Sequence, residues 1–290
     1  MYIPDFNYHK PANLAEALSI MEQCDSGIPL AGGTDLLVEI KKGVRKVTDL
    51  VSLSSVDELK KIENNNDNIV IGPGLTHNQI ADSEIIKSEL PALSDACSKI
   101  GSHQIRNSGT IGGNLCTGAS CADTAPILMA YDAEVKLQSN SSERILPLVE
   151  FMKNHHVTDI GRNEIMTEII IKKSNYKTFA SFEKFGLRDA ASISVASSSC
   201  VLKFDGEICN YAKVVVGACS PVPVISENAS MFLLGKNLND LSKDQNTIDK
   251  AAELASGDSK PISDIRGTAD YRRHLVKVLT VKALSNCFIQ

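Results

Sequence analysis

Two glycine clusters constrain the fold of this 290-residue chain more than any other sequence feature. The first, Ala31-Gly32-Gly33-Thr34-Asp35-Leu36, follows an apolar segment, and the second, Gly109-Thr110-Ile111-Gly112-Gly113-Asn114, lies farther along the chain. A pair of glycines permits positive φ and removes the Cβ atoms that would keep a ligand away from backbone amides. Each cluster can therefore form a tight turn or a concave binding site for an anion such as phosphate.

The first cluster also precedes a segment in which Leu36, Leu37 and Ile40 have helical spacing up to Gly43, and the free amides at a helix N-terminus favour a pyrophosphate. Neither cluster contains Gly-x-Gly-x-x-Gly, and neither is followed by Gly-Lys-Ser or Gly-Lys-Thr. We therefore predict neither a classical Rossmann site nor a P-loop. Thr34, Thr110 and Asn114 have short polar side chains that suit additional hydrogen bonds to a ligand.

Asp123 lies shortly after the second cluster and directly before a helical pattern that begins at Thr124. Two interpretations fit this position. The carboxylate can cap the N-terminus of that helix, or it can accept hydrogen bonds from ribose hydroxyls while the glycine clusters hold phosphates. The sequence leaves both interpretations open.

Composition and charge exclude several classes of protein. The 43% hydrophobic and 22% charged content is typical of a globular protein, and a net charge of −5 disfavours nucleic acid and anionic membranes as partners. No apolar run is long enough for a membrane span and the first residues lack a signal-peptide pattern, so we expect a cytoplasmic protein. The eight cysteines and six histidines show no metal-ligand spacing, so we expect no metal site.

Periodic patterns divide the N-terminal part of the chain into two α/β units. Residues 1–52 alternate helix-like and strand-like segments and form the first unit. Residues 53–176 form the second, in which the polar run from Asn64 to Asn68 indicates a hairpin loop. Thr76 is placed to cap a helix that contains Ile80, Ile85 and Ile86.

The pattern changes in residues 177–290. Two long strand-like segments, Ser192 to Phe204 and Ile208 to Val216, are joined at the turn Asp205-Gly206. Helical spacing follows near Ile248 to Ala255 and again from Ala269 to Leu284. We therefore predict an α+β fold in which residues 177–290 form a separate C-terminal domain of antiparallel strands and helices.

The motifs together resemble the FAD-binding medium subunits of molybdenum hydroxylases, a family that includes carbon monoxide, xanthine and nicotinate dehydrogenases. The resemblance spans nearly the whole chain. Five landmarks carry it, namely Ala31 to Leu37, Gln104 to Leu115, Phe182-Glu183-Lys184 with Arg188, Gly217 to Pro223, and Tyr271 to Leu275.

The resemblance implies a fold of the vanillyl-alcohol-oxidase type, with FAD enclosed by two α/β subdomains and a smaller C-terminal sheet with helices. It also implies that both glycine clusters bind the FAD pyrophosphate, with Asp123 on the ribose side and Lys184 near the rim of the isoalloxazine ring. A surface position is an equally good interpretation of Lys184. The residues expected at FAD from the glycine clusters are Leu30, Ala31, Gly32, Gly33, Thr34, Asp35, Leu36, Thr110, Gly112, Gly113 and Asn114.

The same resemblance implies an electron-transfer subunit of a heteromeric complex. Iron-sulfur and molybdopterin subunits would be its partners, and FAD would pass electrons to NAD(P)⁺ or another acceptor. A nicotinate or xanthine dehydrogenase is the expected type, although the substrate belongs to another subunit. Two alternatives are a scaffold or assembly subunit without flavin, and a stand-alone flavin oxidase of the same fold.

Overall fold

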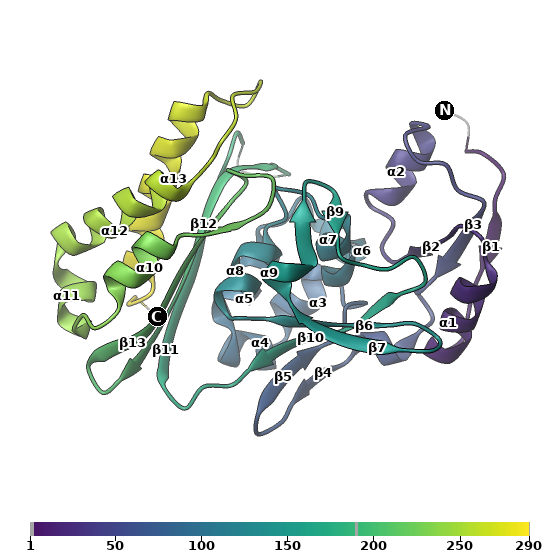
Figure 1. The fold of residues 1–290 in the computed structure, drawn as a ribbon, viewed down its shortest axis with the longest axis horizontal. Helices are drawn as coiled ribbons and strands as arrows, with labels where there is room; N and C mark the ends of the chain where they lie inside the picture. The colour runs from purple at the N-terminus through teal and green to yellow at the C-terminus, as the bar shows by residue number, and fades with distance from the viewer. Residues whose placement is uncertain (1–2, 189–190, 290) are drawn as a thin grey trace.

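The structure is a computed structural model that describes residues 3–188 and 191–289. Three units, which span residues 7–52, 57–172 and 177–286, follow one another along its long axis (Figure 1). The first lies at one end, and the third forms the other end. Among the described residues, no helix is both long enough and apolar enough to cross a membrane.

The first unit is a small parallel sheet with two helices. Its strands are β1 (Asn7–His9), β2 (Gly27–Leu30) and β3 (Asp49–Ser52), and its helices are α1 (Leu14–Gln23) and α2 (Leu36–Lys41). The strands lie in the order β1-β3-β2, and β3 pairs in parallel with both neighbours. Parallel strands need a crossover, and α1 supplies the one between β1 and β2. The side chain of Asn13 caps α1 by accepting a hydrogen bond from the Glu16 amide.

The second unit has a five-stranded sheet in the order β4-β5-β10-β6-β7. Its strands are β4 (Ile62–Asn64), β5 (Asn68–Ile71), β6 (Glu134–Gln138), β7 (Glu143–Pro147) and β10 (Ile165–Lys172), with a separate pair β8 (Met152–Asn154) and β9 (Val157–Thr158). All neighbours in the five-stranded sheet pair antiparallel. The hairpin expected at Asn64 to Asn68 is confirmed, because β4 and β5 pair directly across it.

Short helices cover this sheet (Figure 1). They are the 3-10 helix Asp57–Lys60 and α3 (His77–Asp82), α4 (Glu84–Glu89), α5 (Pro91–Ser98), α6 (His103–Ser108), α7 (Ile111–Thr117), α8 (Thr124–Ala130) and α9 (Leu148–Phe151). The prediction of one helix from Thr76 through Ile86 is wrong. Ser83 ends α3 with extended backbone, and its side chain caps α4 by accepting from the Ile86 amide, so the segment forms two helices.

The third unit is an antiparallel sheet with helices on one face. Its strands are β11 (Lys177–Gly186), β12 (Ser194–Asp205), β13 (Ile208–Gly217) and β14 (Val224–Ile225), and its helices are α10 (Glu227–Leu233), α11 (Leu238–Lys243), α12 (Gln245–Asp258) and α13 (Ala269–Asn286). The predicted turn at Asp205-Gly206 joins β12 to β13, and Gly206 has a φ of 58°. Sequence periodicity did not indicate α10 and α11.

Strand β12 is buried along almost its whole length. Cys200 and Leu202 face the core that the sheet shares with α12 and α13. Val201 between them faces the core of the second unit, where helices α5 and α8 contact the sheet. The sheet is covered on both faces and joins the third unit to the second. A strand in such a sheet is buried on both sides, so its sequence is a continuous run of buried residues.

The first and second units meet where Gly32 packs on the backbone of residues 108 and 109. A Cβ atom built on Gly32 would lie 1.9 Å from the Ser108 carbonyl oxygen and 2.6 Å from the Ser108 carbonyl carbon. Backbone atoms at those distances cannot move aside like a flexible side chain, so the contact admits only glycine. The two glycine clusters are therefore in direct contact in the fold.

This contact predicts that Gly32→Ala separates the two units. The methyl group must displace backbone, and we expect the free energy of unfolding to fall by about 1 to 3 kcal/mol in urea titrations. Gly257→Ala is the matched control, because Gly257 lies in α12 with no atom within 4 Å of a built Cβ. It should leave stability unchanged or raise it by up to about 1 kcal/mol. Equal midpoints for the two variants would contradict the predicted role of Gly32.

Candidate functional site

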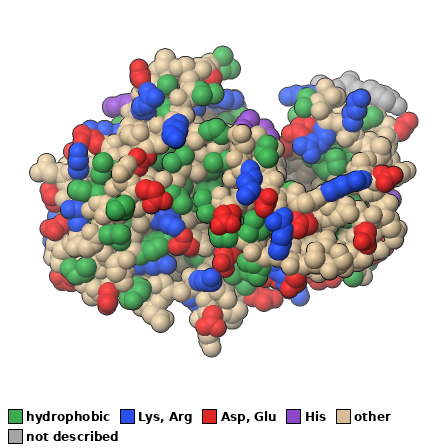
Figure 2. Space-filling view, in the orientation of Figure 1, with side chains coloured by type: hydrophobic (Ala, Val, Ile, Leu, Met, Phe, Trp, Pro, Cys, Tyr) green, Lys and Arg blue, Asp and Glu red, His purple; other side chains and the backbone are tan. Residues whose placement is uncertain are grey.

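Three adjoining cavities run past the contact between the glycine clusters. An apolar cavity of about 340 Å³ lies between the first two units, beside Leu53, Leu59 and Ile165. It shares Gly32 and Gly113 with a central cavity of about 440 Å³. The central cavity in turn adjoins an outer cavity of about 630 Å³ that reaches the third unit. Figure 2 shows the surface notched between the first unit and the rest of the molecule.

The first glycine cluster connects β2 to α2 and faces the central cavity. Its six residues, Ala31, Gly32, Gly33, Thr34, Asp35 and Leu36, all line this space. Gly33 has a φ of 70°, which a residue with a side chain rarely adopts. Leu30 differs from the rest of the predicted set, because it lies at the end of β2 and packs against Ile40, Val47 and Leu50.

The amides of this cluster are free to bind a ligand. Among the described residues, the N–H groups of Gly32, Gly33 and Thr34 donate no hydrogen bond to the protein. Unpaired N–H groups of successive residues in a loop carry partial positive charge and attract anions. This loop therefore supplies donors to the central cavity.

The second glycine cluster is the cap and first turn of α7, and its amides are already bonded. Thr110 is the N-cap, and its Oγ1 accepts from the Gly113 amide at 3.1 Å. The Ile111 amide donates to Leu75, the Gly112 amide to Pro73, and the Asn114 amide to Thr110. This cluster therefore has few amides left for a ligand.

The glycines of the second cluster leave space for a ligand. A Cβ atom built on Gly113 would meet the Thr110 hydroxyl at 2.9 Å and Ala31 at 3.9 Å, and nothing else within 4 Å. Gly113 lines both the apolar and the central cavity. Any side chain there would fill room that a ligand between the two clusters could use. Gly112 instead permits close packing on Pro73, because a Cβ built there would lie 2.4 Å from the Pro73 Cβ.

Asp123 lies in the wall of the central cavity and does not cap α8. It occupies the N-cap position, but its side chain makes no capping bond. Its carboxylate accepts from Lys184 Nζ at 2.6 Å and from Ser194 Oγ at 2.5 Å, and only 6% of the residue is exposed. The capping interpretation is therefore wrong in this structure. The ribose interpretation stays a prediction.

Lys184 is not a surface lysine, because only 11% of its side chain is exposed. Its ammonium also donates to the Lys99 carbonyl oxygen at 3.0 Å. Burial raises the pKa of Asp123, and the charge and hydrogen bond of Lys184 oppose that rise. The pair is neutral as a whole, so the cavity wall carries no net charge at this point.

Two further features of the central cavity were missed by sequence reasoning. Glu39 and Arg45 both line it, and they form an ion pair at 3.0 Å. His77 also lines it, is 2% exposed, and has an Nδ1 atom without a partner among the described residues. Burial and nearby Arg106 lower the pKa of His77 to about 4, so its imidazole is neutral at pH 7. No sequence pattern distinguishes Glu39 and His77 from other helix residues, or Arg45 from other residues of the loop after α2.

The three adjoining cavities and the free amides of the first glycine cluster provide the space and the donors for an elongated ligand with an anionic group. Residues 4–173 match the family described as the FAD binding domain in molybdopterin dehydrogenase, and residues 180–287 match the CO dehydrogenase flavoprotein C-terminal domain. The chain belongs to this family of flavoprotein subunits of molybdenum hydroxylases. The resemblance and the α+β fold expected from the sequence are confirmed.

Similar proteins cover almost the entire chain. The glyceraldehyde dehydrogenase medium chain of Sulfolobus acidocaldarius is 32% identical, over 98% of each chain. The xanthine dehydrogenase FAD-binding subunit of Escherichia coli O157:H7 is 28% identical, over 96% of this chain and 94% of its own. A carbon monoxide dehydrogenase from Hydrogenophaga pseudoflava superimposes with a TM-score of 0.92 at 27% identity, over 100% of this chain and 99% of that one.

The buried pair predicts a large penalty for removing its cation. Lys184→Met leaves the carboxylate of Asp123 buried without a counterion, with only the Ser194 hydroxyl still donating to it, and we expect a loss of about 3 to 5 kcal/mol in urea unfolding. Adding Asp123→Asn should recover part of that loss, because the neutral amide needs no counterion. Lys87→Met is the control, since it breaks the exposed pair with Glu84 and should cost less than about 1 kcal/mol. Similar losses for Lys184→Met and Lys87→Met would contradict this account.

Proposed function

We propose that the chain holds FAD along the three adjoining cavities, with the pyrophosphate between the two glycine clusters. The free amides of Gly32, Gly33 and Thr34 support this placement, because they are the donors that a diphosphate requires. Asp35 and Leu36 open α2 beside them. Ala31, Thr110 and Gly113 line both the central and the apolar cavity, and Gly112 lines the apolar one. In this proposal, Leu30 supports the loop from behind.

The remaining predicted residues would contact the sugar and the flavin. Asp123 would accept hydrogen bonds from sugar hydroxyls, since each carboxylate oxygen can accept more than the single bond it has now. Lys184 would hold that carboxylate in place and lie toward the isoalloxazine ring. Asn114 would offer its amide group, because its Oδ1 accepts from Thr124 and leaves the Nδ2 hydrogens free to donate.

We further propose the role of an electron-transfer subunit in a complex with iron-sulfur and molybdopterin subunits. FAD held by this chain would supply the redox chemistry of electron transfer between the iron-sulfur partner and NAD(P)⁺ or another acceptor. The residues of this chain bind and orient the cofactor. Similar proteins are named for glyceraldehyde, xanthine, carbon monoxide and nicotinate. Nicotinate and xanthine are the first substrates to test.

The domain division proposed for this function is residues 1–52 and 53–176 for the two FAD-binding subdomains and 177–290 for the C-terminal domain. The separate sheets of the three units support it. The cofactor cavities lie where these parts meet.

The placement of the pyrophosphate predicts that Gly113→Asp loses FAD. The new carboxylate would face the phosphates, and like charges in contact cost several kcal/mol, so affinity should fall by more than about tenfold. Gly113→Ala separates size from charge and should have the smaller effect. Gly257→Asp controls for an added charge on an exposed helix. FAD titration followed by fluorescence measures all three, and wild-type affinity in a folded Gly113→Asp variant would refute the placement.

The proposed complex predicts the composition of the native protein. A tagged chain, expressed with its natural partners, should co-purify with FAD, molybdenum and iron, and the complex should reduce an acceptor when substrate is added. Metal analysis and absorption spectra measure this directly. A colourless chain within the complex would favour the scaffold alternative. A yellow chain that oxidises substrate without other subunits would favour the stand-alone oxidase.

A further inference from the structure

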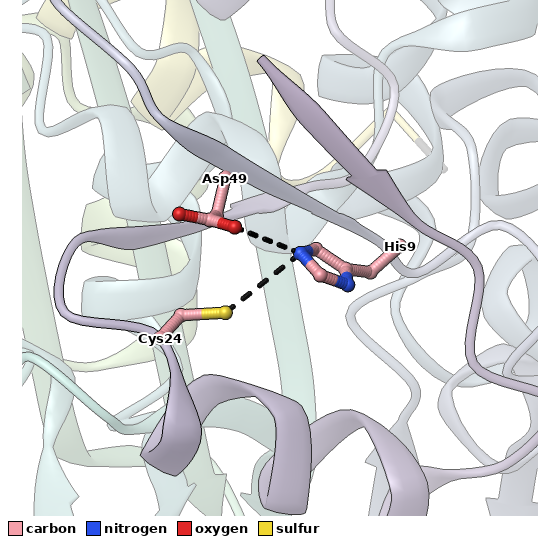
Figure 3. Close-up of side chains that lie close together, drawn as sticks. All are labelled: His9, Cys24 and Asp49. Atoms are coloured by element: carbon pink, nitrogen blue, oxygen red, sulfur yellow. Dashed lines mark hydrogen bonds and ion pairs between the residues drawn. The ribbon is translucent and has the colours of Figure 1, made fainter.

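A cysteine, a histidine and an aspartate converge in the first unit, away from the cavities. His9 ends β1, Cys24 follows the last residue of α1, and Asp49 begins β3. Figure 3 shows one nitrogen of His9 directed toward both other side chains. His9 Nε2 lies 2.9 Å from Asp49 Oδ1 and 3.8 Å from Cys24 Sγ, and the three ligand atoms all lie within 4.8 Å of one another.

These distances suit a tetrahedral metal ion. In a zinc site with the usual bond lengths to sulfur, nitrogen and oxygen, neighbouring ligand atoms are roughly 3.3 to 3.6 Å apart. Small shifts of the three half-buried side chains would bring the observed distances into that range. The mixed sulfur, nitrogen and oxygen set favours Zn²⁺ and similar transition metals over Mg²⁺ and Ca²⁺, which take oxygen ligands.

Surrounding hydrogen bonds hold the carboxylate in position. Asn7 Nδ2 donates to Asp49 Oδ1 at 3.0 Å, and Thr48 Oγ1 donates to Asp49 Oδ2 at 2.8 Å. Ser26 bonds to Thr48 behind it, with 2.6 Å between the hydroxyl oxygens. Supporting bonds of this kind are characteristic of metal-binding carboxylates.

The fold holds Cys24 beside the other two side chains. The Cys24 side chain also packs against β2, because a Cβ built on Gly27 would lie 3.0 Å from the Cys24 Cβ.

We propose that His9, Cys24 and Asp49 bind a zinc-type divalent metal ion, with water in the fourth position. The ion would join β1, the end of α1 and β3, which is the central strand of the sheet that carries the first glycine cluster. Its role would be to stabilise the first unit. Spacing in the sequence does not reveal this site, because the ligands come from three separate elements.

Metal titration of the full-length protein tests the site. After treatment with a chelator, the protein should bind one equivalent of Co²⁺ with a thiolate-to-cobalt charge-transfer band, measured as a difference spectrum against a Zn²⁺-loaded sample. Zn²⁺ should displace the cobalt and raise the Tm. Cys24→Ser should abolish the band and weaken Zn²⁺ binding at least tenfold. Absence of binding, or a thiolate band that persists in Cys24→Ser, would overturn the proposal.

Three further variants make the result specific. Cys121→Ser removes another half-buried thiol and should retain both the band and the affinity. Asn7→Ala should weaken Zn²⁺ about tenfold through the loss of carboxylate support. His9→Gln keeps the Cys24 thiol but removes the imidazole, so it should also bind Zn²⁺ weakly. If circular dichroism shows that Cys24→Ser does not fold, His9→Gln becomes the deciding variant. Wild-type affinity in His9→Gln would refute the site.

Discussion

The close approach of Gly32 to the Ser108 carbonyl is the contact on which the rest of the site depends. It brings together two loops that are far apart in the sequence, and it leaves no room for a side chain at position 32. The apolar and central cavities share Gly32 as a wall, so a change in this contact alters both. The fold therefore creates the site at a boundary between units and not within one of them.

The two glycine clusters are similar in sequence but differ in their hydrogen bonding. The first leaves its amides free, whereas the second bonds its own amides to Leu75, Pro73 and Thr110. An anion between them would accept hydrogen bonds from the first cluster, and the glycines of the second cluster would leave space for it. This division explains why Gly33 has positive φ while Gly112 and Gly113 lie in ordinary helical turns.

Much of the fold follows from local patterns, but the polar contacts of the site do not. The hairpin between β4 and β5 and the long antiparallel strands are encoded by periodicity and turn residues. The partners of Asp123 are 61 and 71 residues away, and no local pattern specifies which lysine or serine will reach it. For that reason, capping and ribose binding were both consistent with the sequence until the tertiary contacts were known.

Electrostatics explain why an acidic chain can offer a site to an anion. Glu39 and Asp123 line the central cavity, and each is paired with a cation, Arg45 and Lys184 respectively. Asp35 lies at the start of α2, where burial and the nearby negative charge of Glu39 raise the pKa of its carboxyl and so disfavour its charged form. The N–H groups of Gly32, Gly33 and Thr34 have no hydrogen-bond partner among the described residues, so they can donate to an anion in this cavity. The net charge of −5 thus describes the electrostatic potential of the whole protein surface, whereas the potential in this cavity depends on the groups in its wall.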